Sequence, residues 1–209
     1  MAGLVLCGGA SRRMGAEKAL LDLEGEPMVV RVARRVGGVA WPVLLAPGRR
    51  GRLGDLGYPE VDDEVDGSGP LGGLVAGLAA SPHRLVAVAA ADMPFVSAEV
   101  LSLLARLIGT ADAAVPVTED GMQPLHAVYS ANGLPALRAA LRSGRRALRE
   151  GVEEALRVRR VDDGEWRTVD PSGRFALNLN RPEDWAMIEG KGQGHTRRTP
   201  IEPNEEEEA

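Results

Sequence analysis

The sequence contains a single cysteine, Cys7, and lacks any long apolar segment. A lone thiol excludes an internal disulfide framework and a multi-cysteine zinc site, and such scarcity is typical of proteins in a reducing compartment. The apolar run near the start stops at Gly8 and follows no basic residues, so it predicts neither an export signal nor a membrane span. We therefore expect a soluble, cytoplasmic protein without a membrane partner.

Basic residues are too few to balance the acidic ones, which leaves a formal net charge of −5. This acidic balance argues against general nucleic-acid binding. Part of it comes from four consecutive glutamates within residues 190–209, where glycine, proline and charge recur without apolar periodicity. At 209 residues, the chain is about the size of one domain. We expect a single domain over residues 1–189, followed by a disordered acidic tail or a linker.

Apolar runs alternate with helical patterns along the chain. This rhythm is typical of βαβ units and predicts an α/β protein with a mostly parallel sheet. The expected strands cover residues 4–7, 43–46, 85–91, 113–117, 125–129, 157–161 and 175–179, and the expected helices cover 28–36, 71–80, 98–108, 133–142 and 182–188.

A glycine-rich segment with three basic residues follows the first expected strand directly. Gly8 and Gly9 could bring backbone amides close to an anion, because ligands of open parallel sheets bind beyond the carboxyl ends of the strands. Arg12, Arg13 and Lys18 could neutralise a triphosphate. The segment has neither the Walker pattern nor G-x-G-x-x-G, which disfavours a P-loop or dinucleotide site. The alternative is a basic turn without a ligand.

A carboxylate, Asp92, ends the strand expected over residues 85–91, which is apolar enough to be buried on both faces. Mg²⁺ prefers oxygen ligands and commonly needs only one or two carboxylates when phosphates and water complete its shell. Asp92 is therefore a candidate magnesium ligand. The alternative is a turn carboxylate or a cap for the helix near Ser97.

Acidic residues precede a second glycine-rich loop, residues 67–73, which opens a helix and could close around a base and ribose. A carboxylate can accept hydrogen bonds from the Watson–Crick edge of guanine. The spacing leaves open which of Asp62, Asp63, Glu64 and Asp66 does so and which are only solvated. Near the far end, Asn178 and Asn180 alternate as in a strand, so both amides could reach a metal, a phosphate or a second substrate.

Four segments, residues 6–20, 69–73, 91–95 and 178–184, together resemble the molybdenum cofactor guanylyltransferase family in order and spacing. The resemblance implies a Rossmann-like three-layer sandwich with a mostly parallel central sheet. It also implies that residues 1–189 are a nucleotidyltransferase domain, which transfers GMP from GTP to the terminal phosphate of the molybdopterin cofactor, releases pyrophosphate and requires Mg²⁺. Molybdoenzyme maturation proteins are further partners that it suggests.

The same resemblance implies roles for individual positions. Arg13, Lys18 and Asp92 would be catalytic, with Asp92 holding the metal. Asn178 and Asn180 would lie near the acceptor or the metal. The implied nucleotide-binding residues are Leu6, Cys7, Gly8, Gly9, Lys18, Asp62, Gly69 and Asp92.

Two departures from the family pattern leave alternatives open. Glu17 precedes the motif lysine where family members often carry aspartate, and residues 43–47 contain no asparagine, where some members have one that contacts the nucleotide. CTP is therefore the nearest competitor as donor. A sugar-phosphate or isoprenoid-pathway nucleotidyltransferase is a second alternative, and a catalytically silent nucleotide-binding protein that delivers the cofactor is a third.

Two residues with reactive side chains are predicted to be structural. Cys7 ends a buried strand, so it is expected to be a small core residue rather than a nucleophile. His126 is likewise expected to be structural. Arg145 and Arg146 follow Gly144, and they either bind the acceptor's phosphate or solvate the start of a helix.

Overall fold

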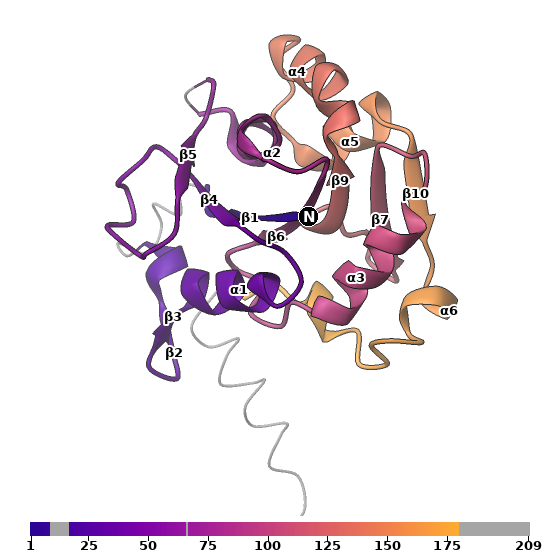
Figure 1. Cartoon of the computed structure of the whole chain (residues 1–209), viewed down its shortest axis with the longest axis horizontal. Helices are drawn as coiled ribbons and strands as arrows, with labels where there is room; N and C mark the ends of the chain where they lie inside the picture. Colours follow the sequence, from indigo (N-terminus) through magenta and orange to yellow (C-terminus); the bar gives the residue numbers. More distant parts are fainter. Residues whose placement is uncertain (9–16, 66, 180–209) are drawn as a thin grey trace, which may run out of the picture. The chain divides into compact units, whose positions relative to one another are not determined.

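The computed structural model describes residues 1–8, 17–65 and 67–179 (Figure 1). Its internal contacts divide the chain into Met1–Asn178 and Leu179–Ala209. Every helix and strand described below belongs to the first of these units. The domain boundary expected at residue 189, the helix expected over 182–188 and the tail lie outside the described residues.

A central sheet runs through the first unit, with the strand order β10-β7-β9-β6-β1-β4-β5. Only β9 is antiparallel to its neighbours in this order, and the short β8 pairs antiparallel with β7. The mostly parallel sheet is therefore confirmed. The strands are β1 (Ala2–Leu6), β4 (Val43–Gly48), β5 (Glu60–Asp62), β6 (Leu85–Ala90), β7 (Ala113–Thr118), β8 (Gly121–Met122), β9 (His126–Ser130) and β10 (Val158–Val161).

Helices cover both faces of this sheet, which gives the three-layer α/β architecture that was expected (Figure 1). The helices α1 (Met28–Gly37) and α3 (Ala98–Leu107) pack on one face. On the other face lie α2 (Gly69–Ala80), α4 (Leu134–Arg142) and α5 (Leu148–Ala155). A single-turn helix, α6 (Asp163–Trp166), adds Trp166 to the core beneath α1 and α3.

The central strands are apolar on both faces, which explains why they form a parallel sheet. All five residues of β1 are buried. Val5 faces the core under α1 and α3, whereas Leu4 faces the core under α2, as the alternation of a strand requires. Strands β4 and β6 flank β1 in parallel, so the carboxyl ends of all three meet at one edge.

The strand expected over residues 175–179 is wrong. The chain forms a short 3-10 helix over Arg174–Ala176, and residues 177–179 have no regular structure. Phe175 is fully buried, with its ring centroid 5.2 Å from that of Trp166 and 4.6 Å from that of His126. Burial of Phe175 and Leu179 therefore holds this segment, whose described residues pair with no strand of the sheet.

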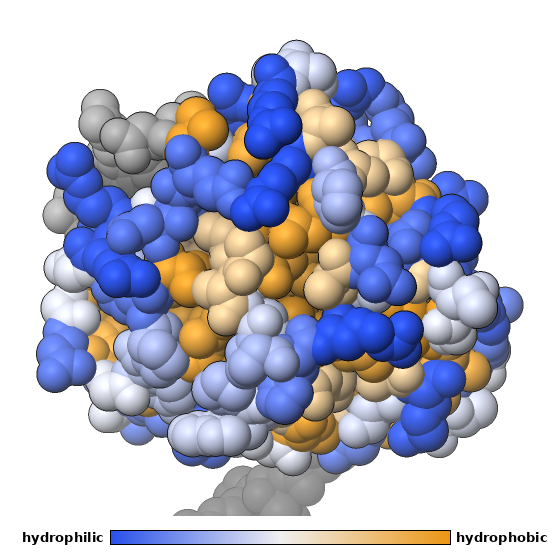
Figure 2. Space-filling view, turned by 45° about the horizontal axis from the view of Figure 1, so that its top comes forward, coloured by the Kyte–Doolittle hydropathy of each residue, from blue (hydrophilic) through white to orange (hydrophobic). Residues whose placement is uncertain are grey.

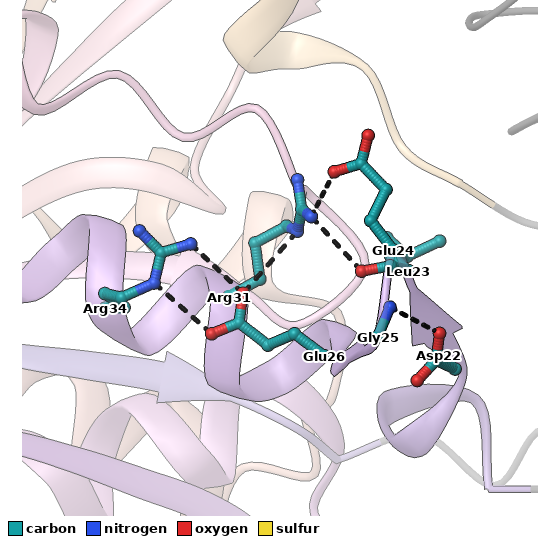
Figure 3. Close-up of polar contacts among 7 residues, drawn as sticks. All are labelled: Asp22, Leu23, Glu24, Gly25, Glu26, Arg31 and Arg34. Carbon is teal, nitrogen blue, oxygen red and sulfur yellow. Dashed lines mark hydrogen bonds and ion pairs between the residues drawn. The ribbon is translucent and has the colours of Figure 1, made fainter.

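A small hairpin joins the first 3-10 helix, η1 (Lys18–Leu20), to α1 (Figure 3). Its strands are β2 (Asp22–Leu23) and β3 (Glu26–Pro27), and its turn residues both have positive φ, as a two-residue hairpin turn requires. Two arginines of α1 fasten it. Arg31 Nη2 donates to Leu23 O at 3.1 Å, and Arg34 Nη2 donates to Glu26 Oε2 at 3.0 Å. The hairpin therefore fixes the chain that follows Lys18.

The surface mixes polar and apolar residues, as is usual for folded proteins. On the face that Figure 2 shows, apolar residues (orange) gather in a central area that hydrophilic ones (blue) surround. Within the described part of the chain, no helix is both long and apolar enough to cross a bilayer.

His126 makes the folded state sensitive to acid. Its side chain is fully buried, and burial lowers its pKa from 6.5 to about 3, against the opposing influence of the Asp170 carboxylate. Between these two values the unfolded chain binds a proton that the folded chain excludes. Titration of this ring therefore does not lower the free energy of unfolding above about pH 6.5, and it lowers that free energy progressively as the pH falls toward 3.

We expect this loss to reach a few kcal/mol at about pH 4. Urea unfolding of the wild type and of His126→Leu, at about pH 7.5 and about pH 4.5, measures it. The drop in unfolding free energy between the two pH values should be smaller in His126→Leu, because that core position no longer titrates. Equal drops in both proteins would contradict the assignment.

Candidate active site

Two cavities open beside the carboxyl end of β1, the first toward β6 and the second toward β4, and both are lined by Leu6, Gly8 and Pro70. The first has a volume of about 340 Å³ and the second about 530 Å³. This is the edge of a parallel sheet at which ligands usually bind. Of the predicted nucleotide-binding residues, Leu6 and Gly8 therefore lie where a ligand would be expected.

Lys18 and Asp92 meet in the first cavity. Lys18 Nζ lies 2.8 Å from Asp92 Oδ2, and the two side chains are 18% and 29% exposed. Lys18 is positioned by η1 and Asp92 by the turn after β6, 74 residues away in the sequence. Since β1 and β6 are parallel neighbours, segments that follow them come together. The structure thus brings together Lys18, which was predicted to bind phosphate, and Asp92, which was predicted to bind a metal, from two separate motifs.

The local structure around Asp92 argues against the helix-cap alternative. Helix α3 is capped by Ser97, whose Oγ accepts a hydrogen bond from Val100 N at 3.3 Å. Asp92 instead lies within a tight turn, in which Met93 N donates to Ala90 O at 3.1 Å. Its carboxylate therefore lies in the cavity rather than at the start of the helix.

The donor set fits magnesium. In the described residues, no group of three or more histidine, cysteine, aspartate or glutamate side chains could hold a metal by itself. Mg²⁺ does not need one, because one carboxylate together with nucleotide phosphates and water is a common shell. Asp92 offers such a carboxylate, and its partner Lys18 carries an ammonium group, which commonly binds phosphate.

Asp63, rather than Asp62, lines the second cavity. Asp63 Oδ2 accepts a hydrogen bond from Ser68 Oγ at 2.9 Å, and Asp63 N donates to Gly48 O at 3.1 Å. The side chain of Asp62 is 53% exposed and pairs with Arg50, whose Nε lies 3.2 Å from Asp62 Oδ2. Sequence reasoning left this choice open and then followed the resemblance to Asp62. The alternation of β5 would have favoured Asp63, had this short strand been recognised.

Two glycines of the second loop are required by their surroundings. Gly69 has a φ of +66°, and a Cβ there would lie 3.3 Å from the carbonyl oxygen of Arg146. A Cβ on Gly72 would lie 2.4 Å from Ser68 Cβ, so any side chain would displace the hydroxyl that holds Asp63. The glycine-rich sequence thus allows α2 to begin beside the carboxylate.

Comparison with known proteins identifies the family. Residues 3–158 match the model of the MobA-like NTP transferase domain. A relative from Opitutus terrae, described as a probable molybdenum cofactor guanylyltransferase, is 37% identical over 196 residues, which cover 88% of this chain and 92% of the relative. The chain belongs to the molybdenum cofactor guanylyltransferase family. The predicted family and the predicted enzyme class, nucleotidyltransferase, are confirmed.

Solved structures agree with the assignment to this family. The molybdopterin-guanine dinucleotide biosynthesis protein A from Archaeoglobus fulgidus is 27% identical with a TM-score of 0.78, and the match covers 93% of this chain and all (100%) of that one. The 2-C-methyl-D-erythritol 4-phosphate cytidylyltransferase from Thermus thermophilus is 20% identical with a TM-score of 0.61, and the match covers 91% of this chain and 98% of that one. The second likeness shows a shared fold and no more.

Cys7 lies in the wall of the first cavity in a form unsuited to nucleophilic attack. Its side chain is 6% exposed, and Sγ donates to Val5 O at 3.3 Å. Burial raises the pKa of this thiol to about 12, so it remains protonated at neutral pH. This environment fits the interpretation of Cys7 as a core residue.

Several residues that were predicted to bind substrate line neither of the two cavities, and others lie outside the described residues. Asn178 is exposed and lines neither cavity. Arg145 forms an ion pair with Glu154, and Arg146 Nη1 donates to Leu141 O at 3.0 Å. The remaining ones, Gly9, Arg12, Arg13, Asp66 and Asn180, lie outside the described residues.

Proposed function

We propose that this protein transfers GMP from GTP to the terminal phosphate of the molybdopterin cofactor, with Mg²⁺ bound at Asp92 and pyrophosphate released. The observation that carries this proposal is the contact of Lys18 with Asp92, 2.8 Å apart in a cavity beside the glycine-rich opening. The names of relatives, which are described as molybdenum cofactor guanylyltransferases, support the choice of GTP as donor and of the cofactor as acceptor.

The reaction needs no covalent enzyme intermediate. An oxygen of the acceptor phosphate forms a bond to the α-phosphorus of GTP, and the bond from that phosphorus to the bridging oxygen of the β-phosphate breaks. Pyrophosphate leaves with the electron pair. The Lys18 ammonium stabilises the charge that develops on it, and Arg13, which lies outside the described residues, is proposed to assist. A Mg²⁺ ion held by Asp92 would neutralise phosphate charge.

The second cavity is proposed to hold the base, with Asp63 as the group that reads it. Guanine presents two neighbouring N–H donors on its Watson–Crick edge, which one carboxylate can accept. Cytosine presents acceptors beside its single amino group, so it would leave the carboxylate facing lone pairs. A site built to accept hydrogen bonds discriminates strongly against a ligand that lacks the donors. Asp63, held by Ser68, thus favours GTP over CTP.

Adjacent carboxylates provide a matched test of this assignment. Asp63→Asn is expected to raise the Kd for GTP by about tenfold or more, because the amide replaces an acceptor with a donor. Asp62→Asn should change it by less than about twofold, because that side chain pairs with Arg50 at the surface. Calorimetric titration of both variants with GTP and CTP measures the effect. A larger change in Asp62→Asn would reverse the assignment.

Product analysis tests the proposed reaction. The purified protein is incubated with GTP, Mg²⁺ and molybdenum-loaded molybdopterin, and the product is examined by mass spectrometry. A cofactor heavier by one GMP, formed only in the absence of a chelator, is the expected result. Transfer to a sugar phosphate, but not to molybdopterin, would replace the proposed acceptor. Bound GTP without any product would favour a silent nucleotide-binding protein.

A further inference from the structure

The guanidinium of Arg52 joins three separate segments of the chain at the active site. Its Nη2 donates to Cys7 O at 2.6 Å, at the end of β1. Its Nε donates to Pro47 O at 2.7 Å, near the end of β4. Its Nη1 forms an ion pair with the carboxylate of Glu17. Each of the three nitrogens therefore has its own partner, and the side chain is only 25% exposed.

The core fixes the loop that carries Arg52. The next residue, Leu53, is 4% exposed and belongs to the core under α1 and α3. Arg52 N also donates to Arg49 O at 3.3 Å. Because the backbone is held at Arg52 N and at Leu53, the Cα of Arg52 has a defined position from which its side chain reaches the three acceptors.

These contacts hold both ends of the glycine-rich segment. Cys7 immediately precedes Gly8, and Glu17 immediately precedes Lys18. The backbone of Glu17 is held as well, because its carbonyl oxygen accepts a hydrogen bond from Leu20 N at 2.8 Å. Arg52 thus contacts the residue that directly precedes Lys18.

We propose that Arg52 is a positioning residue, which sets the place of Lys18 in the active site through Glu17. This inference rests on the proposed nucleotidyl transfer. The glutamate side chain is long enough to reach the guanidinium, and the same guanidinium also contacts Pro47 O near the end of β4.

Lysine cannot replace arginine in this role, since an ammonium group lacks the planar fork that serves three acceptors in fixed directions. Arg52→Lys is therefore expected to lower kcat about tenfold, as small misplacements of catalytic groups do. The KM for GTP should change by less than about threefold. A direct contact with the nucleotide would instead raise KM and leave kcat unchanged, and that result would overturn the proposal.

Changes at Glu17 test the same device from the other side. Glu17→Asp should lower kcat about fivefold or more, because the shorter side chain loses its contact with Arg52. The charge-reversed pair Glu17→Arg with Arg52→Glu should remain impaired, because the carbonyl oxygens of Cys7 and Pro47 would then face a carboxylate. Full activity in either protein would refute the proposal.

A matched control and a second readout distinguish failure of the positioning role from failure of the proposed nucleotidyl transfer. Arg157→Lys removes a bidentate contact with Asp112, far from Lys18 in the sequence, and should leave kcat unchanged. Hydrogen exchange of amides 18–21 should be faster in Arg52→Lys than in the wild type and in Arg157→Lys. If the wild type showed no nucleotidyl transfer but this exchange difference held, the proposed function would fail while the positioning contact stood. Unchanged exchange would overturn the positioning role itself.

Discussion

Lys18→Ala is expected to lower the rate of pyrophosphate release by about a hundredfold or more, because it removes the charge that stabilises the leaving group. The Lys18 side chain is 18% exposed, so its ammonium acts in a partly desolvated site where charge is screened less than in water. The effect should appear in kcat and kcat/KM together, since the interaction strengthens in the transition state.

Steady-state pyrophosphate release at saturating GTP and acceptor measures this loss. Lys18→Met retains most of the side-chain volume without the charge, so it controls for packing and should be equally impaired. The melting temperatures of both variants should stay within a few degrees of the wild type. Normal turnover in a folded Lys18→Ala protein would exclude Lys18 from the reaction.

Asp92→Asn is expected to cause a loss of similar size, at least about a hundredfold in kcat, because the amide removes the negative charge that we propose binds Mg²⁺. Raising the Mg²⁺ concentration should restore at most part of the activity. The substitution also removes the ion pair with Lys18. Because this pair is partly exposed, the change in the free energy of unfolding should be small compared with the loss of turnover.

Activity over a series of Mg²⁺ concentrations distinguishes a metal ligand from a mere partner of Lys18. A ligand's loss shifts the Mg²⁺ dependence to higher concentrations, whereas loss of the ion pair alone would leave it unchanged. Asp163→Asn removes an exposed carboxylate, 68% exposed and paired with Arg167, and serves as the control. An unchanged Mg²⁺ dependence in Asp92→Asn would contradict the assignment of the metal.

The sequence predicted those parts of the fold that apolar burial determines. Residues 4–7 and 85–91 are apolar without alternation, and their short length between turn residues favours strands that are covered on both faces. The structure pairs these two strands as parallel neighbours, so the residues that follow each strand converge at one edge. The meeting of Lys18 with Asp92 depends on this pairing, which the sequence did not predict.

The remaining errors and omissions come from segments that side-chain contacts, rather than periodicity, determine. Residues 175–179 resemble a strand in composition, but Phe175 packs against Trp166 instead of pairing. The short strand β5 contains one buried residue, Val61, which is too little to reveal the alternation that brings Asp63 to the cavity. Arg52 stands in a glycine-rich loop with no pattern, and two of its three partners, Glu17 and Cys7, are distant in sequence.

The central claim is that the protein uses GTP to guanylylate the molybdopterin cofactor. Initial rates of pyrophosphate release, with Mg²⁺, molybdenum-loaded molybdopterin and equal concentrations of GTP or CTP, test it most directly. We expect release that depends on the molybdopterin acceptor and is at least about tenfold faster with GTP than with CTP, because the Asp63 carboxylate accepts hydrogen bonds that only guanine donates in full. Faster release with CTP, or none with either nucleotide, would contradict it.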